Sequence, residues 1–286
     1  MTIGFIGGSG IYDALPLRDT RTVEVETPYG DPSAPLTVGE FGDTGREVVF
    51  VPRHGPKHQR SPTTLPYRAN VYALKEQGVT HVLASNAVGS LREDLPPQTL
   101  VIPDQIYDRT KHRDLTFFEE GVVVHQPFAD PYCAELNEIL ADAAEEATDA
   151  DVVRGGTYVC IEGPQYSTRA ESEFYREQGW DVIGMTTIPE AKLAREAEMA
   201  YATVTGVTDY DVWKADSEVT LEEVLKNAEK NETAIKETVE AAIEAIPEDH
   251  ECPCHSSLEG TINTPDDAID EDVKSDLAPL ISEYVE

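Results

Sequence analysis

Basic residues are scarce in this sequence. Its 286 residues include 22 Lys and Arg against 55 Asp and Glu, for a formal net charge of −33 at pH 7. Nucleic acids and anionic membrane surfaces bind proteins through basic patches, so we expect neither as a partner. The acids are spread along the chain and hydrophobic periodicity persists between them, which excludes a disordered polyanion. A halophilic cytoplasm, where salt screens the self-repulsion, is the hypothesis that this composition favours.

Long apolar runs and a secretory leader are also lacking. No uncharged stretch approaches the roughly 18 apolar residues that a membrane span requires, so we expect no membrane association. The first residues lead straight into a predicted strand at 3–6, without a basic or extended apolar leader. We therefore expect a cytoplasmic protein.

Cysteine is rare, with Cys133, Cys160, Cys252 and Cys254 as its only occurrences. Disulfides are unusual in cytoplasmic proteins. Cys252 and Cys254 are separated by one residue, whereas structural zinc sites usually separate their paired cysteines by two to four. We therefore expect free thiols and no metal site. A bonded Cys252–Cys254 pair, structural or redox-active, and a metal site stay open as alternatives.

A dinucleotide-binding fingerprint is missing as well. The glycine-rich segment 7–10 follows the first predicted strand but does not match G-x-G-x-x-G, and residues 11–16 make a poor helix. Glu24 and Glu26 do lie near where a ribose-binding acid could stand. A nucleotide-binding or dinucleotide-binding protein without enzymatic activity therefore stays open as a distant alternative.

What is present is an alternation of strand and helix patterns without repeats or linkers, which predicts one α/β domain over residues 1–246. Residues 247–286 form an acidic extension with a short helix near 273–284, residues 22–39 read as turns, and residues 104–118 read as a loop. We predict strands at 3–6, 47–51, 79–84, 100–103, 156–161, 180–185 and 204–207, and helices at 67–77, 132–146, 170–178, 190–199 and 219–246.

Polar residues gather where these strands end. Ser9 stands in the first glycine-rich turn, Arg53 and His54 follow the second strand, and small polar residues follow the strand at 79–84. Backbone amides, hydroxyls and guanidinium groups are the usual donors to oxyanions. Because ligands bind at the carboxyl ends of strands in open α/β sheets, we expect these donors to share an anion site.

Two acids, Asp209 and Asp211, end the buried strand at 204–207. A surface turn is one explanation, since Asp is common in turns, but an unpartnered carboxylate is costly to bury. Neither a Ser-His-Asp order nor a Walker loop is present. Anion donors facing a leaving-group acid are the arrangement that a phosphorolysis requires. Tyr166 and Met185 could flank a flat ring and a sugar.

In this order, six motifs closely resemble the 5′-methylthioadenosine phosphorylases of the purine nucleoside phosphorylase superfamily. The resemblance spans about residues 3 to 245 and implies that superfamily's α/β fold, a mixed central sheet flanked by helices. The motifs are Gly7-Gly-Ser-Gly10, Arg53-His-Gly55, Asn86-Ala-Val-Gly-Ser-Leu-Arg92, Ile161-Glu-Gly-Pro164, Met185-Thr-Thr-Ile-Pro-Glu190 and Thr208-Asp-Tyr-Asp-Val-Trp213.

The resemblance also implies roles for individual residues. Phosphate, a co-substrate in a reaction without a cofactor, would be held by Ser9, Arg53, His54, Asn86, Ala87 and Thr186. The nucleoside would contact Met185 at the ribose, Asp209, Tyr210 and Asp211 at the base, Tyr166 and Ser167 near the ring, and Leu221 and Val224 in the 5′ pocket. His125 would reach a neighbouring subunit's site in a homo-oligomer, a trimer or a hexamer. Ser9 and Asn86 stand where Thr is frequent in the family.

The choice of base follows from hydrogen bonding. A carboxyl accepts from the N6 amino group of adenine and, when protonated, donates to N7, so Asp209 suits a 6-aminopurine, whereas Asn would suit a 6-oxopurine. Apolar Leu221 and Val224 suit a methylthio group. We therefore expect a pentosyltransferase of purine and methionine salvage that releases adenine and 5-methylthioribose 1-phosphate. A 6-oxopurine nucleoside or methylthioinosine phosphorylase is the alternative.

Overall fold

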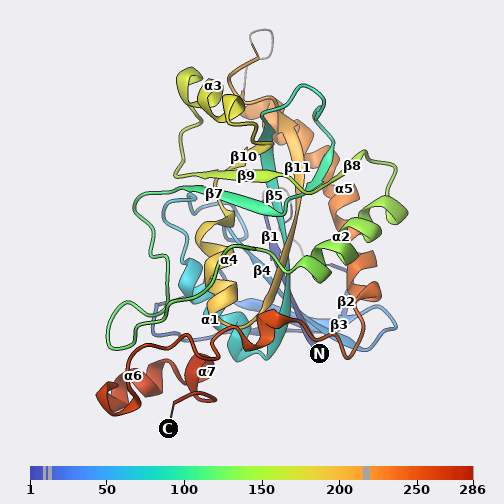
Figure 1. The fold of residues 1–286 in the computed structure, drawn as a ribbon. Helices are drawn as coiled ribbons and strands as arrows, with labels where there is room; N and C mark the ends of the chain where they lie inside the picture. Colours follow the sequence, from blue (N-terminus) through green and yellow to red (C-terminus); the bar gives the residue numbers. More distant parts are fainter. Residues whose placement is uncertain (9–10, 12–14, 215–219, 286) are drawn as a thin grey trace.

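The structure is a computed structural model, and it describes residues 1–8, 11, 15–214 and 220–285. Within these residues one sheet of 11 strands carries the fold, and most of it follows the order β2-β3-β4-β1-β5-β10-β9-β7 (Figure 1). β11 pairs with β5 and β6, and β6 pairs with β8. The strands are β1 (Thr2–Gly7), β2 (Leu17–Val23), β3 (Leu36–Phe41), β4 (Arg46–Pro52), β5 (Val79–Ser90), β6 (Leu100–Ile102), β7 (Gln105–Arg109), β8 (Val152–Arg154), β9 (Thr157–Ile161), β10 (Val182–Gly184) and β11 (Ala200–Asp209).

The middle of the sheet is its most apolar part. β1, β4, β5 and β11 run parallel to one another, and β11 is buried along its whole length. Strands covered on both faces read as nearly continuous apolar runs, which is why the sequence reveals these four. The pairing is mixed, because β2, β3 and β10 join the sheet in antiparallel fashion.

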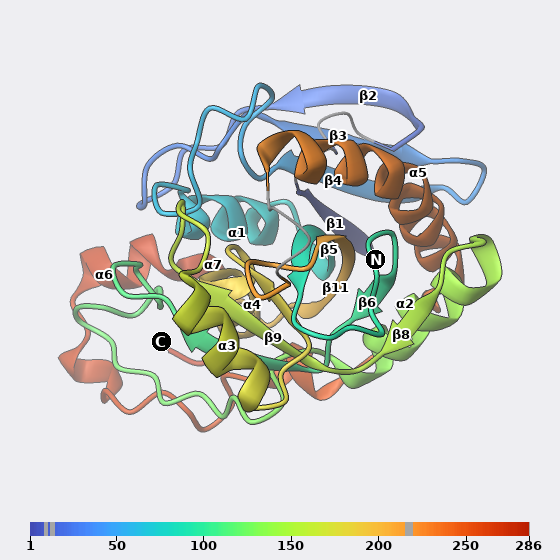
Figure 2. The ribbon, with the colours of Figure 1, turned by 90° about the horizontal axis from the view of Figure 1, so that it is seen from above.

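Helices cover both faces of the sheet (Figure 2). α1 (Tyr67–Glu76) and α4 (Thr187–Glu196) contribute to one buried apolar cluster, and α2 (Ala134–Ala147) and α5 (Leu221–Ala245) contribute to a second. α3 (Arg169–Glu177) begins at a capping box, in which Thr168 accepts from the Glu171 amide and the Glu171 carboxylate accepts from the Thr168 amide. Among the described residues no helix is long and apolar enough to cross a membrane.

Residues 247–285 pack onto both of these clusters. Cys252 and Cys254 are buried in the second, whereas Leu258, Ile269 and Leu277 are buried in the first. α6 (Glu271–Asp276) and α7 (Ala278–Ile281) lie at the far end of this segment. The Tyr72 hydroxyl of α1 donates to the Asp276 carbonyl over 2.8 Å. The short helix predicted near 273–284 is therefore two short helices, and part of this segment is core.

Five of the predicted segments were wrong in type or extent. β7 lies inside the predicted loop 104–118; it is a half-exposed edge strand, so it has no apolar run. β2 and β3 flank the predicted turns, and β2 is too polar to signal a strand. β5 continues to Ser90 because β10 and β11 pair with its polar end. This pairing overrides the low strand propensity of those residues. β10 is shorter than the predicted strand 180–185, and α4 starts at Thr187.

Candidate active site

A cavity of about 480 Å³ opens where β4 and β11 end, beside the last residues of β5. Twelve of the fifteen predicted site residues line it, drawn from segments far apart in sequence, and these are Arg53, His54, Asn86, Ala87, Tyr166, Ser167, Met185, Thr186, Asp209, Asp211, Leu221 and Val224. The expectation that the polar strand ends share one site is thereby supported. Its lining also includes residues 58–62, which follow Arg53 and His54 in the chain.

Arg53 is the only guanidinium predicted for the site, and its side chain is 1% exposed. Its Nε and Nη2 donate to the two carboxylate oxygens of Glu190, each over 2.7 Å, and its Nη1 donates to the Ser85 carbonyl over 2.7 Å. Burial lowers the pKa of Arg53, but the Glu190 carboxylate outweighs it and holds the pKa above its usual value. Three of five N–H donors are therefore used, and two are left for a ligand.

Gly8, which directly follows β1, lies against this arginine. The Gly8 amide donates to the Ser85 hydroxyl over 2.9 Å. A Cβ on Gly8 would lie 2.2 Å from the Ser85 carbonyl oxygen and 3.0 Å from Arg53 Nη1, so only glycine allows this approach. Ser9, which was predicted to bind phosphate, lies outside the described residues.

His54 is buried beside Arg53, and burial lowers its pKa to about 3. The ring is therefore neutral at physiological pH. Its Nδ1 lies 2.9 Å from the Arg60 carbonyl oxygen. Because a carbonyl oxygen can only accept, the proton of the neutral ring belongs on Nδ1, and Nε2 keeps its lone pair. His54 can thus accept a hydrogen bond at Nε2.

Asn86 and Thr186 form one hydrogen-bonded unit. Asn86 Nδ2 donates to the Thr186 hydroxyl oxygen over 2.6 Å, and Asn86 Oδ1 accepts from the Thr203 hydroxyl over 2.5 Å. Because the Thr186 oxygen accepts from Asn86, its own proton is free to be donated to a ligand. Asn86 therefore positions Thr186.

Asp209 and Asp211 also line the cavity, and both are almost fully buried. Asp209 accepts from the Thr208 hydroxyl over 2.7 Å and from the Asp211 amide over 2.8 Å. Burial raises the pKa of Asp209 to about 6 and also raises that of Asp211. Hydrogen bonds with the Ser172 and Ser167 side chains oppose part of the rise for Asp211. The pair is thus a buried and hydrogen-bonded pair of acids, not a surface turn.

The first turns of α5 close the cavity with apolar side chains. Leu221, Val224 and Leu225 line it, although Leu221 is 64% exposed and Leu225 is 51% exposed. Tyr166, also exposed, stands on the segment between β9 and α3. Exposed apolar residues at the rim of a cavity are surface that a bound ligand or another subunit would cover.

Two predicted residues lie away from this cavity. Tyr210 packs edge-on against Trp213, its ring carries Lys214 Nζ at 3.7 Å, and its hydroxyl points to the Glu93 carbonyl. His125 is exposed, and its amide donates to the Thr261 carbonyl over 3.0 Å. Within one chain, His125 therefore does not contact the cavity.

Two supporting residues were missed. Glu190 orients Arg53; it ends the motif Met185-Thr-Thr-Ile-Pro-Glu190, but the sequence assigned it no role of its own. Arg113, part of the predicted loop, donates to the carbonyls of Met185 and Glu162, each over 2.7 Å, and to Ile188. It fastens the segments that carry Met185 and Tyr166. No local pattern reveals these contacts, because the partners are far apart in sequence.

Comparison with known proteins gives the family. A family model described as the phosphorylase superfamily matches residues 2–244. The S-methyl-5′-thioadenosine phosphorylase of Chloroflexus aurantiacus is 50% identical over 285 residues, which cover 99% of this chain and 98% of the relative. That of Nitrosopumilus maritimus is 48% identical over 257 residues, or 90% of this chain and 96% of the relative.

Solved structures agree. A methylthioadenosine phosphorylase from an antarctic soil metagenomic library superposes with a TM-score of 0.92 at 44% identity, and the match covers 98% of each chain. A mutant adenosine/methylthioadenosine phosphorylase from Schistosoma mansoni, in complex with methylthioadenosine, superposes with a TM-score of 0.78 at 34% identity, again over 98% of each chain. The predicted fold and family are confirmed: the chain belongs to the phosphorylase superfamily and, within it, to the S-methyl-5′-thioadenosine phosphorylases.

Proposed function

We propose that this protein cleaves the N-glycosidic bond of 5′-methylthioadenosine with inorganic phosphate and releases adenine and 5-methylthioribose 1-phosphate. One observation carries the proposal: a single cavity holds the Arg53 and Thr186 donors together with the buried acids Asp209 and Asp211. A phosphorolysis needs both groups, one for the nucleophile and one for the leaving base. The reaction is a transfer of a pentosyl group and draws on no cofactor, since phosphate is the nucleophile and a carboxyl supplies the proton.

At the phosphate end, Arg53 offers two N–H donors and Thr186 offers its hydroxyl proton. His54 Nε2 accepts a hydrogen bond from the P–OH group of hydrogen phosphate, because the ring, whose pKa is lowered to about 3, stays neutral. The Glu190 carboxylate fixes the Arg53 guanidinium through two hydrogen bonds of 2.7 Å, so the anion meets a preorganised donor. Ala87 borders this end, and Ser9 is proposed to complete it.

At the base end, Asp209 acts as the acid. Its pKa of about 6 leaves a protonated fraction near neutral pH, and that proton passes to N7 as the C1′–N9 bond breaks. The Asp211 carboxylate, which the Ser172 and Ser167 side chains hold in place, accepts from the N6 amino group. Met185 lies against the ribose, Tyr166 and Ser167 border the ring, and Leu221 and Val224 surround the methylthio group. Phosphate then attacks C1′ of a loose, oxocarbenium-like sugar from the opposite face.

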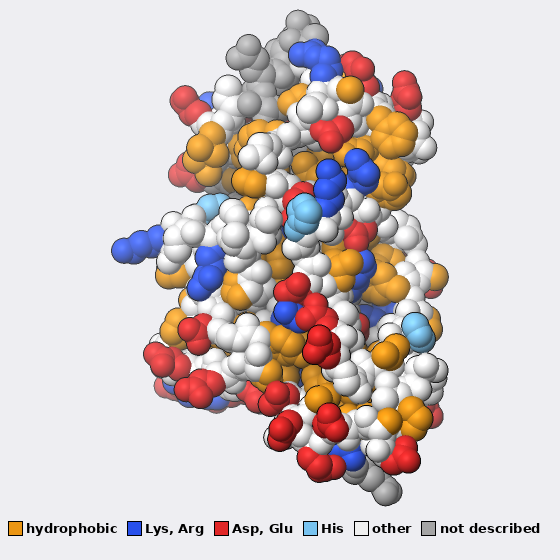
Figure 3. Space-filling view, turned by 90° about the vertical axis from the view of Figure 1, so that its left-hand side faces the viewer, with side chains coloured by type: hydrophobic (Ala, Val, Ile, Leu, Met, Phe, Trp, Pro, Cys, Tyr) orange, Lys and Arg blue, Asp and Glu red, His pale blue; other side chains and the backbone are white. Residues whose placement is uncertain are grey.

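The protein is further proposed to be a cytoplasmic homo-oligomer, a trimer or a hexamer, adapted to high salt. Leu221 and Leu225 form an exposed apolar rim, and this favours a neighbouring subunit that covers the rim. In such an oligomer, His125 would contribute to the cavity of the neighbouring subunit. Acidic side chains crowd the lower part of the face in Figure 3, as expected for a surface that depends on salt for screening. Light scattering in molar KCl tests the oligomer, and a monomer would remove the role of His125.

Base release from three nucleosides tests the substrate. We expect methylthioadenosine to be cleaved with the highest kcat/KM, adenosine less efficiently and inosine least. Asp209→Asn should lower the rate with methylthioadenosine and shift the preference toward 6-oxopurines, because an amide donates to O6. Cleavage of inosine by the unmodified enzyme, with methylthioadenosine inert, would instead identify a 6-oxopurine nucleoside phosphorylase.

A further inference from the structure

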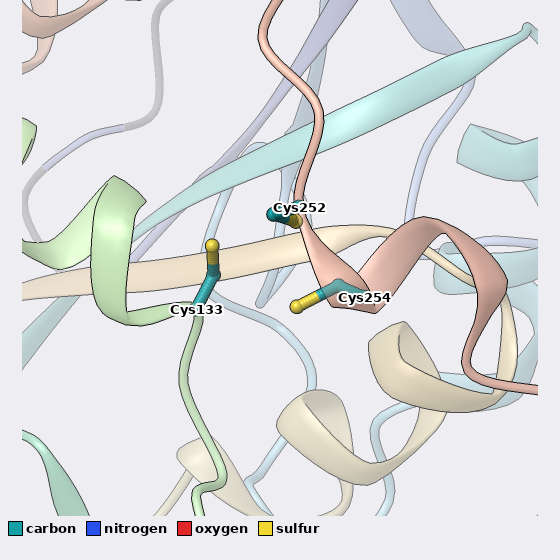
Figure 4. Close-up of side chains that lie close together, drawn as sticks. All are labelled: Cys133, Cys252 and Cys254. Atoms are coloured by element: carbon teal, nitrogen blue, oxygen red, sulfur yellow. The ribbon is translucent and has the colours of Figure 1, made fainter.

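Three of the four cysteines meet far from the cavity. The Sγ atoms of Cys133, Cys252 and Cys254 all lie within 4.8 Å of one another, and none is in a disulfide. Figure 4 shows their side chains projecting into the space between the start of α2 and the turn at Pro253–Ser256. The spacing of Cys252 and Cys254 alone disfavours a metal site, but the structure supplies the third thiol, from a position far earlier in the chain.

The separation of the sulfurs is close to that of a metal-bound thiolate cluster. In a tetrahedral zinc site with Zn–S bonds of about 2.3 Å, two sulfurs lie about 3.8 Å apart. The upper limit of 4.8 Å is therefore about 1 Å wider, which small rotations of the three side chains would close. The thiols are almost completely buried, in the cluster that α2 and α5 share, so an ion there would be shielded from water.

His255 stands beside the cluster as a fourth candidate ligand. Its ring hydrogen-bonds with Cys252, while its Nε2 lies 3.2 Å from the Thr80 carbonyl oxygen. A carbonyl only accepts, so Nε2 carries a proton and Nδ1 keeps the lone pair when the ring is neutral. Metal-binding histidines commonly donate their second ring nitrogen to such a carbonyl, which fixes the ring.

The end of a helix lies at the cluster. Cys133 is the N-cap residue of α2, whose positive helix end stabilises a thiolate. The positive charges of Arg195 and Lys75 act on Cys254 and on His255, respectively.

We propose that Cys133, Cys252 and Cys254 bind one Zn²⁺ ion per chain as thiolates, with His255 Nδ1 as the fourth ligand. Binding forms three Zn–S bonds and one Zn–N bond, and the three thiols release up to three protons. The ion fastens residues 247–286 to the start of α2. This is a structural site, because all four positions are filled by protein and none is near the phosphorolysis cavity.

The test uses the untagged full-length protein, purified with a reductant and stripped with a chelator. Zn²⁺ titration against a chromophoric chelator should give one tight site per chain. Co²⁺ should give thiolate-to-metal charge-transfer bands and the visible bands of a tetrahedral centre, a readout that requires no variant. Absence of tight Zn²⁺ binding, or Co²⁺ spectra without thiolate bands, overturns the proposal.

Variants identify the ligands. Cys133→Ser and Cys254→Ser should each weaken Zn²⁺ binding by more than the roughly 10–100-fold that loss of a supporting partner costs, and His255→Gln should weaken it by at least ~10-fold. Cys160→Ala is the matched control: Cys160 is a buried cysteine on β9, outside the cluster, and its replacement should keep one tight site. Unchanged binding in Cys133→Ser, or a Cys252–Cys254 disulfide in the reductant-purified protein, contradicts the site.

Discussion

The buried pair between Arg53 and Glu190 permits a quantitative prediction. Their side chains are 1% and 2% exposed, and the Tyr201 hydroxyl adds a third hydrogen bond to Glu190 over 2.8 Å. Glu190→Gln keeps the shape of the side chain but removes its charge, which leaves a buried guanidinium without a counter-ion. Removing one partner of a buried ion pair typically costs about 3–5 kcal/mol. Since Gln retains one acceptor oxygen, we expect the lower part of that range.

The assay is equilibrium unfolding by denaturant in molar KCl, at one fixed protein concentration because an oligomer's stability depends on it. Glu138→Gln is the matched control, because Glu138 pairs with Arg154 over 2.9 Å but is 72% exposed. Exposed pairs contribute at most about 1 kcal/mol, so the control should stay close to the unmodified protein.

Phosphate provides a second arm of the same experiment. The bound anion adds negative charge beside Arg53, so saturating phosphate should narrow the stability gap between Glu190→Gln and the unmodified protein. If the two unfolding free energies differ by less than about 1 kcal/mol without phosphate, the claim that Glu190 balances the buried charge of Arg53 is refuted. A gap that phosphate leaves unchanged would refute the placement of the anion next to Arg53.

Three further predictions follow from the site and the composition. Burial raises the pKa of Asp209 from 3.8 to about 6, so the folded state binds this proton more tightly than the unfolded state does. The free energy of unfolding should therefore fall by up to ~3 kcal/mol as the pH rises from 3.8 through about 6. Asp209→Asn should lose this slope and be more stable than the unmodified protein at pH 8 in denaturant unfolding; equal slopes would contradict the raised pKa. Leu221→Ser should lower kcat/KM for methylthioadenosine relative to adenosine by about tenfold. This is the low end of the ~1–3 kcal/mol that such apolar contacts contribute, because Leu221 is 64% exposed. Leu115 is an exposed leucine away from the cavity, so Leu115→Ser should leave this ratio unchanged. With a net charge of −33, the melting temperature should rise between dilute and molar KCl, and a flat profile would exclude adaptation to salt.

The sequence predicts the centre of the fold better than its edges. β11 and the first part of β5 are apolar on both faces, so their residues read as strands wherever they are placed. β7 alternates between exposed and half-buried positions, and the far end of β5 contains Asn86, Gly89 and Ser90. Those segments are strands because neighbouring strands pair with them, which local propensity cannot express.

Some residues of the site could also be predicted from the sequence, and others could not. Its reactive residues fall in short motifs at strand ends, so the sequence could name Arg53 and Asp209. Their supports come from distant segments: Glu190 is a partner of Arg53 from another helix, and Cys133 meets Cys252 only after folding. The raised pKa of Asp209 depends on burial, which also becomes visible only in three dimensions.

Transfer of phosphate to the sugar tests the central claim most directly. Incubation with methylthioadenosine and radiolabelled phosphate in molar KCl should yield adenine and labelled 5-methylthioribose 1-phosphate in equal amounts, and adenine release should stop when phosphate is withheld. Adenine release at an unchanged rate without phosphate, with free 5-methylthioribose as the second product, would contradict the account, because the cavity would then use water as its nucleophile.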